Sequence, residues 1–160
     1  MGAVNIRKAT PEDAELIIGF IRELAEFEKM ERDVVATADG IRESLFSEGA
    51  SARALVVSID GYPIGYAVYF YNYSTWLGKN GIYLEDLYIT TKHRGNGAGK
   101  MVLRYLAQLA VDEGCGRFEW SVLDWNQPAI QFYKSIGAVP QNDWVLYRLD
   151  GRSLFDFAAS

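Results

Sequence analysis

The chain has 160 residues, of which 49% are hydrophobic and 23% are charged, and its formal net charge is −5. This length and composition predict one soluble globular domain over residues 1–160 with a sizeable core. The acidic balance argues against non-specific binding to nucleic acid or to an anionic membrane, and it suits a cationic substrate. No apolar run approaches the roughly 20 residues that span a bilayer.

The few cysteine and histidine residues narrow the chemistry. Cys115 is the only cysteine, so no disulfide can form within the chain, and the first residues lack the apolar core of a signal peptide. Both features predict a cytoplasmic protein. His93 is the only histidine, which excludes a His-based catalytic triad or a metal site with several histidines. We expect no metal.

The first half of the chain predicts a strand, two helices and a hairpin. Residues 4–8 form the strand, and Thr10-Pro11 then marks the start of a helix. Apolar residues at a spacing of three to four predict that one face of this helix is buried. Thr37 caps a shorter second helix. Residues 53–59 and 62–71 are strands joined by Asp60-Gly61, a hairpin signal.

The second half alternates strands and helices. We expect strands at residues 82–89, 118–123 and 144–149, a helix from about Gly99 to Glu113, and a further helix after the cap Asn126. This order predicts an α/β fold, with a mixed, twisted sheet of about six to seven strands flanked by helices.

A basic turn rich in glycine follows the strand at 82–89. Its pattern is Arg94-x-x-Gly97-x-Gly99, with Gly95 in addition. A Walker loop would need a glycine in place of Arg94, and the dinucleotide fingerprint would need its third glycine one residue later. Glycines at a helix N-terminus let backbone N–H groups converge on an anion. The alternative is a turn that only starts the helix.

Several segments together resemble a known family. The Arg94 turn, followed by Asn126 and by Phe132-Tyr133, resembles the GNAT superfamily of acetyl-CoA-dependent N-acetyltransferases. Residues 22–29, 74–78, 83–86 and 122–127 further resemble the diamine acetyltransferase family, and most closely its thialysine N-ε-acetyltransferase branch. The resemblance covers nearly the whole chain. It implies the GNAT acyl-CoA N-acyltransferase fold, with acetyl-CoA as co-substrate.

In that family the cofactor lies between two parallel strands that splay apart, which the resemblance places at 82–89 and 118–123. The backbone expected to pair with the pantetheine arm is that of Leu87, Tyr88 and Ile89. The residues expected to receive the pyrophosphate are Arg94, Gly95, Asn96, Gly97, Ala98, Gly99 and Lys100. The residues expected to flank the other side of the cofactor are Asn126, Gln127, Pro128 and Ala129.

The reaction needs a deprotonated amine. A lysine-like amine has a pKa of about 10.4, so its deprotonation at pH 7 costs roughly 4–5 kcal/mol. Glu85 matches the family's base, which takes the proton through water. The alternative is that Glu85 forms an ion pair at the end of its strand. In a regular strand Asp86 faces the opposite side, so only one of the two carboxylates should face the cleft.

Tyr133 matches the family's general acid, which donates to the sulfur of departing CoA. The alternative is that it packs in the core, as most tyrosines do. The resemblance assigns acceptor binding to Phe27, Glu28, Glu85, Glu119, Trp120 and Ser121. For Glu28, the alternative is an acidic residue at the end of a helix that binds no substrate. Ser74 replaces an acid of the polyamine-preferring members and Phe27 replaces a tyrosine, which weakens the case for spermidine.

Together these features predict an N-acetyltransferase that acts by direct attack in a ternary complex. The acceptor is a small diamine, a polyamine or a lysine-like amine such as thialysine. The resemblance also implies a homodimer. We expect no nucleic-acid or membrane partner. Two alternatives stay open: a noncatalytic acyl-CoA-binding sensor, and an acetyltransferase for a protein N-terminus or a lysine side chain.

Overall fold

The computed structural model describes residues 2–160. They form two compact units, one ending at Ser121 and the other spanning Val122–Ser160, and each is described by itself. No helix within the described residues has the length and apolar character needed to cross a membrane.

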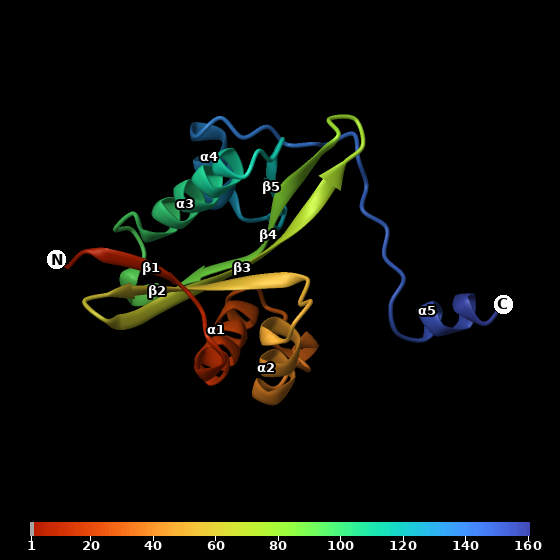
Figure 1. The fold of residues 1–160 in the computed structure, drawn as a ribbon, viewed down its shortest axis with the longest axis horizontal. Coiled ribbons are helices and arrows are strands. Elements are labelled where there is room, and N and C mark those ends of the chain that lie inside the picture. Colours follow the sequence, from red (N-terminus) through yellow and green to blue (C-terminus); the bar gives the residue numbers. More distant parts are fainter. Residues whose placement is uncertain (1) are drawn as a thin grey trace. The chain divides into compact units, whose positions relative to one another are not determined.

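The first unit is built on a mixed five-stranded sheet in the order β1-β2-β3-β4-β5 (Figure 1). Neighbours from β1 to β4 are antiparallel, and β5 runs parallel to β4. The strands are β1 (Val4–Lys8), β2 (Ala52–Ile59), β3 (Tyr62–Ser74), β4 (Lys79–Ile89) and β5 (Phe118–Trp120). The predicted α/β class is confirmed, although the sheet has fewer strands than the six to seven expected.

The predicted hairpin joins β2 to β3. Asp60 and Gly61 both have positive φ angles, of 50° and 80°. Two consecutive residues of this kind form the type I′ turn that matches the twist of paired strands. The Asp60-Gly61 turn therefore fixes the register in which Ile59 of β2 pairs with Tyr62 of β3.

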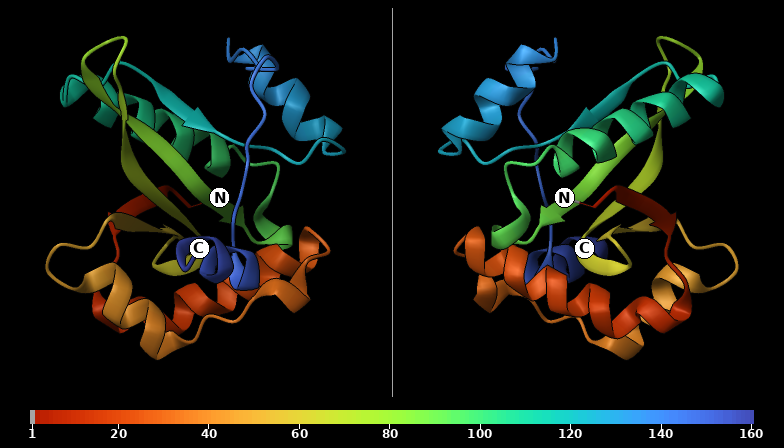
Figure 2. Two further views of the ribbon diagram at one scale, coloured as in Figure 1. Left: turned by 90° about the vertical axis from the view of Figure 1, so that its right-hand side faces the viewer. Right: turned by 90° about the vertical axis from the view of Figure 1, so that its left-hand side faces the viewer.

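Helices cover both faces of this sheet (Figures 1 and 2). α1 (Ala14–Phe27), which follows a 3-10 turn, and α2 (Ala38–Phe46) lie on one face, and α3 (Ala98–Asp112) lies on the other. Thr37 caps α2 as predicted, because its Oγ1 accepts a hydrogen bond of 3.1 Å from the Gly40 N–H. Short 3-10 turns also occur at Glu31–Asp33 and Thr91–His93.

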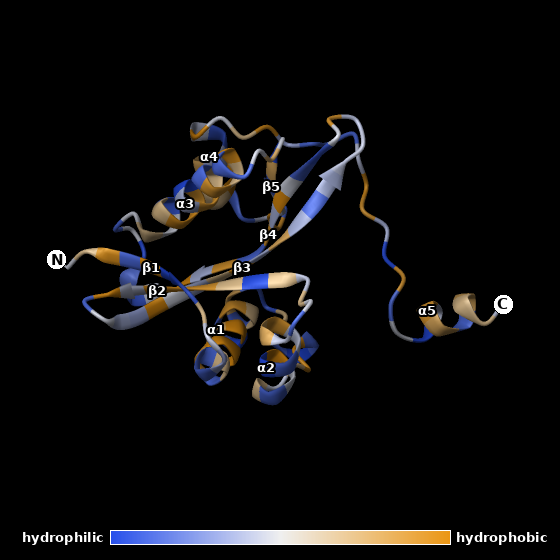
Figure 3. Ribbon diagram, in the orientation of Figure 1, coloured by the Kyte–Doolittle hydropathy of each residue, from blue (hydrophilic) through white to orange (hydrophobic). Residues whose placement is uncertain are grey.

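The core follows from the apolar spacing of the helices. α1 buries Ile17 and Phe20 against Tyr66, Val68 and Tyr88 of the sheet. α3 buries its own apolar face, and both helices alternate between hydrophobic and hydrophilic residues around their circumference (Figure 3). This pattern is that of a helix with one face against a sheet.

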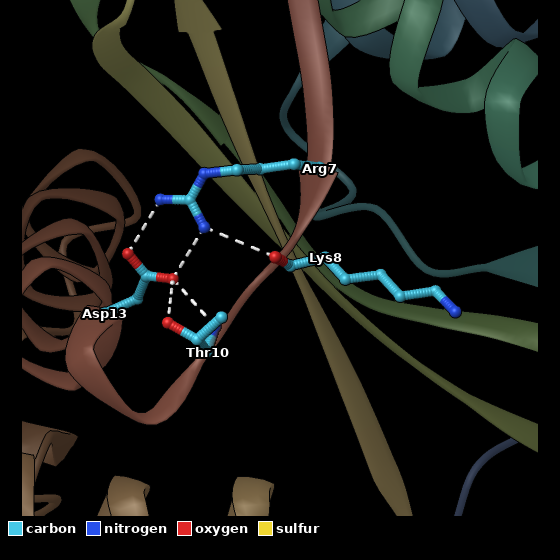
Figure 4. Close-up of polar contacts among 4 residues, drawn as sticks. All are labelled: Arg7, Lys8, Thr10 and Asp13. Atoms are coloured by element: carbon cyan, nitrogen blue, oxygen red, sulfur yellow. Dashed lines mark hydrogen bonds and ion pairs between the residues drawn. The ribbon is translucent and has the colours of Figure 1, made fainter.

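An ion pair ties β1 to the start of α1 (Figure 4). The two terminal nitrogens of the Arg7 guanidinium, Nη1 and Nη2, each donate to the carboxylate of Asp13 at 2.8 Å. The same carboxylate accepts from the Thr10 N–H at 2.7 Å. The hydrogen bonds from Arg7 lower the pKa of Asp13, which is buried. A bidentate pair of this geometry sets the angle at which the chain leaves β1 for α1.

β4 contains one residue too many for its partner. Asp86 pairs with Val68 and Leu84 pairs with Tyr69, so Glu85 lies opposite no residue of β3. An extra residue of this kind is a β-bulge, which bends the strand and changes which side chains share a face. The alternation that a regular strand would impose on Glu85 and Asp86 therefore does not apply.

The second unit contains α4 (Gln127–Ser135) and α5 (Gly151–Ala158). Asn126 caps α4 as predicted, its side chain accepting from the Ala129 N–H at 3.4 Å. The predicted strand at 144–149 is wrong, because this stretch joins no ladder in the part of the chain that the structure describes. α5 was not predicted. The strand expected at 118–123 ends at Trp120.

Candidate active site

The glycine turn has the shape of an anion cradle. Gly97 is the N-cap of α3 with a φ of 86°, and the Ala98 N–H lies 3.3 Å from the Asn96 side-chain oxygen. A Cβ added at Gly95, Gly97 or Gly99 would meet no atom of the chain within 4 Å. The space in front of these residues is open, as an approaching phosphate requires.

Gly99 is the informative member of this group. It lies inside α3 and has no positive φ, and the chain itself places nothing near it. Neither its backbone conformation nor its packing requires glycine, and glycine inside a helix costs about 1 kcal/mol relative to alanine. An approaching ligand would meet open space at this position.

Arg94 connects the turn to α1. Its Nε donates a hydrogen bond of 2.9 Å to the Ile89 carbonyl at the end of β4. The guanidinium carbon lies 4.5 Å from the centre of the Phe27 ring and 5.4 Å from that of Tyr88. Arg94, which is predicted to bind the cofactor, is therefore in direct contact with Phe27, which is predicted to bind the acceptor.

The parallel pairing of β4 with β5 is short. It joins Ile82 to Phe118, Tyr83 to Glu119 and Leu84 to Trp120, and β4 then continues alone on this side to Ile89. The residues predicted for the pantetheine arm, Leu87 to Ile89, lie on this continuation. On its other side the continuation pairs with β3.

Three carboxylates gather around the buried hydroxyl of Tyr66. This hydroxyl donates to Asp86 Oδ2 at 2.7 Å. Burial raises the pKa of Tyr66, and the charges of Asp86, Glu28 and Glu85 raise it further. The end of α1 and the bulge in β4 thus bring Glu28, Glu85 and Asp86 to one place, which we call the acidic cluster.

Two members of the cluster, Glu28 and Asp86, are partly buried, whereas Glu85 is exposed. Burial raises the pKa of Asp86, although the hydrogen bond from Tyr66 opposes this shift. Burial also raises the pKa of Glu28, and the charge of Asp86 adds to the effect. Neither Glu28 nor Asp86 belongs to an ion pair found among residues 2–160. Such a place favours the binding of a cation.

Asp86 is the residue that sequence reasoning missed. The alternation rule assigned it to the face away from Glu85, whereas the bulge at Glu85 leaves Asp86 beside Glu28. The available signal was the Glu85-Asp86 pair itself. Two adjacent carboxylates in the stretch 82–89, whose other residues are apolar or aromatic, are costly unless a functional site uses both.

The other residues predicted for the acceptor lie on or next to β5. Glu119 accepts a hydrogen bond of 3.3 Å from the Asn72 amide and lies 4.0 Å from Arg117. The Trp120 ring packs against Phe118, with 4.9 Å between centroids. Ser121 Oγ and the Tyr83 hydroxyl are 2.5 Å apart. These side chains are held by contacts along the sheet edge.

Tyr133 lies on α4 of the second unit, one turn after Gln127, Pro128 and Ala129. Burial raises the pKa of Tyr133, so its hydroxyl stays protonated at neutral pH. The side chain is a hydrogen-bond donor in this state. Glu85 belongs to the first unit.

Comparisons with known proteins identify the family. The model of a family described as "Acetyltransferase (GNAT) family" matches residues 17–138. The thialysine N-epsilon-acetyltransferase of Caenorhabditis elegans is 40% identical over 96% of both chains, and that of Mus musculus is 36% identical over 99% of both. An integron cassette protein of V. cholerae, a solved structure, superposes with a TM-score of 0.82 and 26% identity over 98% of both chains. The chain therefore belongs to the GNAT family of acetyltransferases and is an enzyme of that class.

Proposed function

We propose that the protein transfers the acetyl group of acetyl-CoA to the primary amine of a small, lysine-like acceptor such as thialysine, or of a diamine or polyamine. The observation that carries the proposal is the acidic cluster, two of whose members, Glu85 and Asp86, lie on β4, the strand that leads into the turn at residues 94–100. An amine bound there would lie next to an acyl group held along β4. The similarity to thialysine acetyltransferases supports the same acceptor class.

The donor would be held by backbone more than by side chains. The open turn at residues 94–100 accepts the diphosphate, and the β4 backbone from Leu87 to Ile89 pairs with the pantetheine amides. Asn126 to Ala129, at the start of α4, flank it. When bound, acetyl-CoA supplies an activated thioester and a thiol leaving group. The chain itself orients the amine and moves the protons.

Glu85 would take the proton that the attacking nitrogen loses, directly or through one water. The bulge exposes its side chain while the neighbouring Leu84 stays buried. Tyr133, protonated because of its raised pKa, would donate to the sulfur as negative charge develops there. In the balanced reaction, one N–C bond forms and the thioester C–S bond breaks. The acceptor enters as an ammonium, and its nitrogen loses two protons: one passes through Glu85 to solvent, and the other is balanced by the proton that ends on the CoA thiol.

Glu28 and Asp86 would hold the second charged group of the acceptor, its distal ammonium. Phe27, on the neighbouring position of α1, would pack against the aliphatic part of the acceptor. Ser74 favours a short acceptor: it is buried, and its Oγ accepts from Arg117 at 2.7 Å and from the Leu77 N–H at 3.1 Å. This position therefore does not add a further carboxylate for a long polyamine.

We also propose that both units act as one N-acetyltransferase domain and that two copies form a homodimer. The family match at 17–138 crosses the boundary between the units, which supports a single domain. In the second unit, large apolar side chains between residues 144 and 157 are exposed, with Leu146 at 83% and Tyr147 at 90%. A monomeric soluble protein rarely exposes so much apolar surface in one segment.

Release of free thiol from acetyl-CoA tests the activity across acceptors. We expect kcat/KM for thialysine to exceed that for a diamine of similar length and that for a lysine-containing peptide. If none of the amines on the panel causes release of thiol, although the protein still binds acetyl-CoA, the result would favour the noncatalytic sensor. A higher kcat/KM for the peptide than for thialysine would favour the protein acetyltransferase.

A further inference from the structure

Arg94 is the first residue of the turn at residues 94–100, and it contacts the end of α1. Its Nε is hydrogen-bonded to the Ile89 carbonyl at 2.9 Å, which fixes one edge of the guanidinium to β4. One of the rings within about 6 Å of the guanidinium is Phe27, the last residue of α1. At this distance a guanidinium is attracted to the face of an aromatic ring. A positive charge is also favourable near the C-terminus of a helix.

The two rings beside Arg94 differ in burial. Tyr88 is 5% exposed, its hydroxyl donates to Glu23 Oε1 at 2.9 Å, and its ring packs 6.0 Å from that of Phe20. The core therefore fixes Tyr88. Phe27 is 41% exposed. Arg94 is thus in contact with the residue that directly precedes Glu28.

We propose that Arg94 is a positioning residue that couples donor binding at residues 94–100 to amine binding at Phe27 and Glu28. The inference rests on the proposed function, which assigns these two roles. A guanidinium binds anions along its edge and stacks through its faces, so one side chain can serve both. A diphosphate on the turn immobilises Arg94, and the immobilised face holds Phe27 in the orientation that the amine needs.

Thermodynamic linkage makes this coupling measurable. If CoA raises the affinity for the amine by some factor, the amine raises the affinity for CoA by the same factor. We expect a factor of about five in the wild type, which equals about 1 kcal/mol. CoA is used in place of acetyl-CoA so that no turnover occurs during the titration.

The experiment is calorimetric titration of CoA in the absence and in the presence of saturating thialysine. The expected ratio of the two Kd values is about five for the wild type and near one for Phe27→Leu and for Arg94→Met. Arg94→Lys keeps the charge and loses the planar stacking group. It should therefore retain most of the CoA affinity while its ratio falls toward one.

Lys92→Met is the matched control, because Lys92 lies two residues before Arg94, is exposed, and carries the same charge. Its ratio should stay at the wild-type value. A wild-type ratio of one overturns the coupling, as does a ratio of five retained in both Arg94→Met and Phe27→Leu. Those results leave the proposed function intact if CoA binds. No CoA binding by folded wild-type protein overturns both.

Discussion

At the scale of single residues, Glu28 and Asp86 hold their protons more tightly than exposed carboxylates do. The ordinary pKa values are about 3.9 for Asp and about 4.3 for Glu. Burial raises those of Asp86 and Glu28 above these values, and the charge of Asp86 adds to the effect on Glu28. A bound ammonium reverses both effects, because it favours the ionised carboxylates.

The first prediction concerns the pH dependence of amine binding. Thialysine affinity should fall as the pH is lowered through the raised pKa values, because protonated carboxyls cannot pair with the ammonium. Asp86→Asn should weaken binding at pH 7 by about tenfold, the loss expected for one charge-assisted hydrogen bond. It should also lower the pKa of Glu28 and so move the acid limb to lower pH. Calorimetry between pH 4 and pH 8 measures both effects.

The control is Asp39→Asn, since Asp39 pairs with Arg42 on the exposed surface of α2. Its profile should match that of the wild type. An Asp86→Asn protein whose affinity and acid limb are both unchanged would show that the carboxylate at position 86 does not hold the amine.

The second prediction concerns Tyr133. Tyr133→Phe removes the hydroxyl and keeps the ring, so the fold and the Kd for acetyl-CoA should stay close to the wild-type values. The kcat should fall by at least a hundredfold, the lower range for loss of a general acid. Tyr73→Phe, which alters an exposed tyrosine of β3, should leave kcat unchanged. A near-normal kcat for Tyr133→Phe excludes the role of general acid.

At the scale of elements, the local signals in the sequence predicted most of the fold. Asp60-Gly61 and Thr37 act within a few residues, and the structure confirms both. The bulge at Glu85 depends on how two strands pair, which no local pattern records. The proposed site therefore combines parts that the sequence predicts, the turn and Glu85, with one that it does not predict, Asp86.

The third prediction concerns the turn between β4 and α3. Gly99→Ala places a methyl group in the open space where we propose that the diphosphate binds. The Kd for CoA should therefore rise by at least tenfold while the protein stays folded. Gly19→Ala is the matched control, because Gly19 lies within α1 and also faces open space. Its Kd should be unchanged, and its stability should rise by up to about 1 kcal/mol.

Calorimetric Kd values and thermal melts measure the two effects on these glycine variants. A Gly99→Ala protein that binds CoA as tightly as the wild type would mean that the diphosphate lies elsewhere. In that case the glycine at position 99 would have no explanation in the structure.

At the scale of the whole molecule, the C-terminal part departs most from the sequence prediction. Residues 144–149 have the composition of a strand, yet a strand exists only when a neighbour supplies hydrogen bonds. Within residues 2–160 no strand pairs with this stretch. The resemblance to a family implied a homodimer, and this segment is the surface that we expect a second copy to cover.

The fourth prediction concerns this surface. The wild type should sediment as a dimer at micromolar concentration, and Leu146→Glu should shift it to monomer, because a buried, unpaired carboxylate is costly in an apolar interface. Val35→Glu is the control: Val35 is 89% exposed and lies outside the segment. It should remain dimeric. A monomeric wild type, or a dimeric Leu146→Glu, contradicts the assignment.

The most direct test of the central claim is a competition assay read by mass spectrometry. The protein is incubated with acetyl-CoA and equal concentrations of thialysine, a diamine and a lysine-containing peptide. The account predicts that thialysine gains one acetyl group first, with one free CoA thiol for each acetyl transferred. Acetylation of the peptide before thialysine, or of none of the three by protein that binds acetyl-CoA, would contradict it.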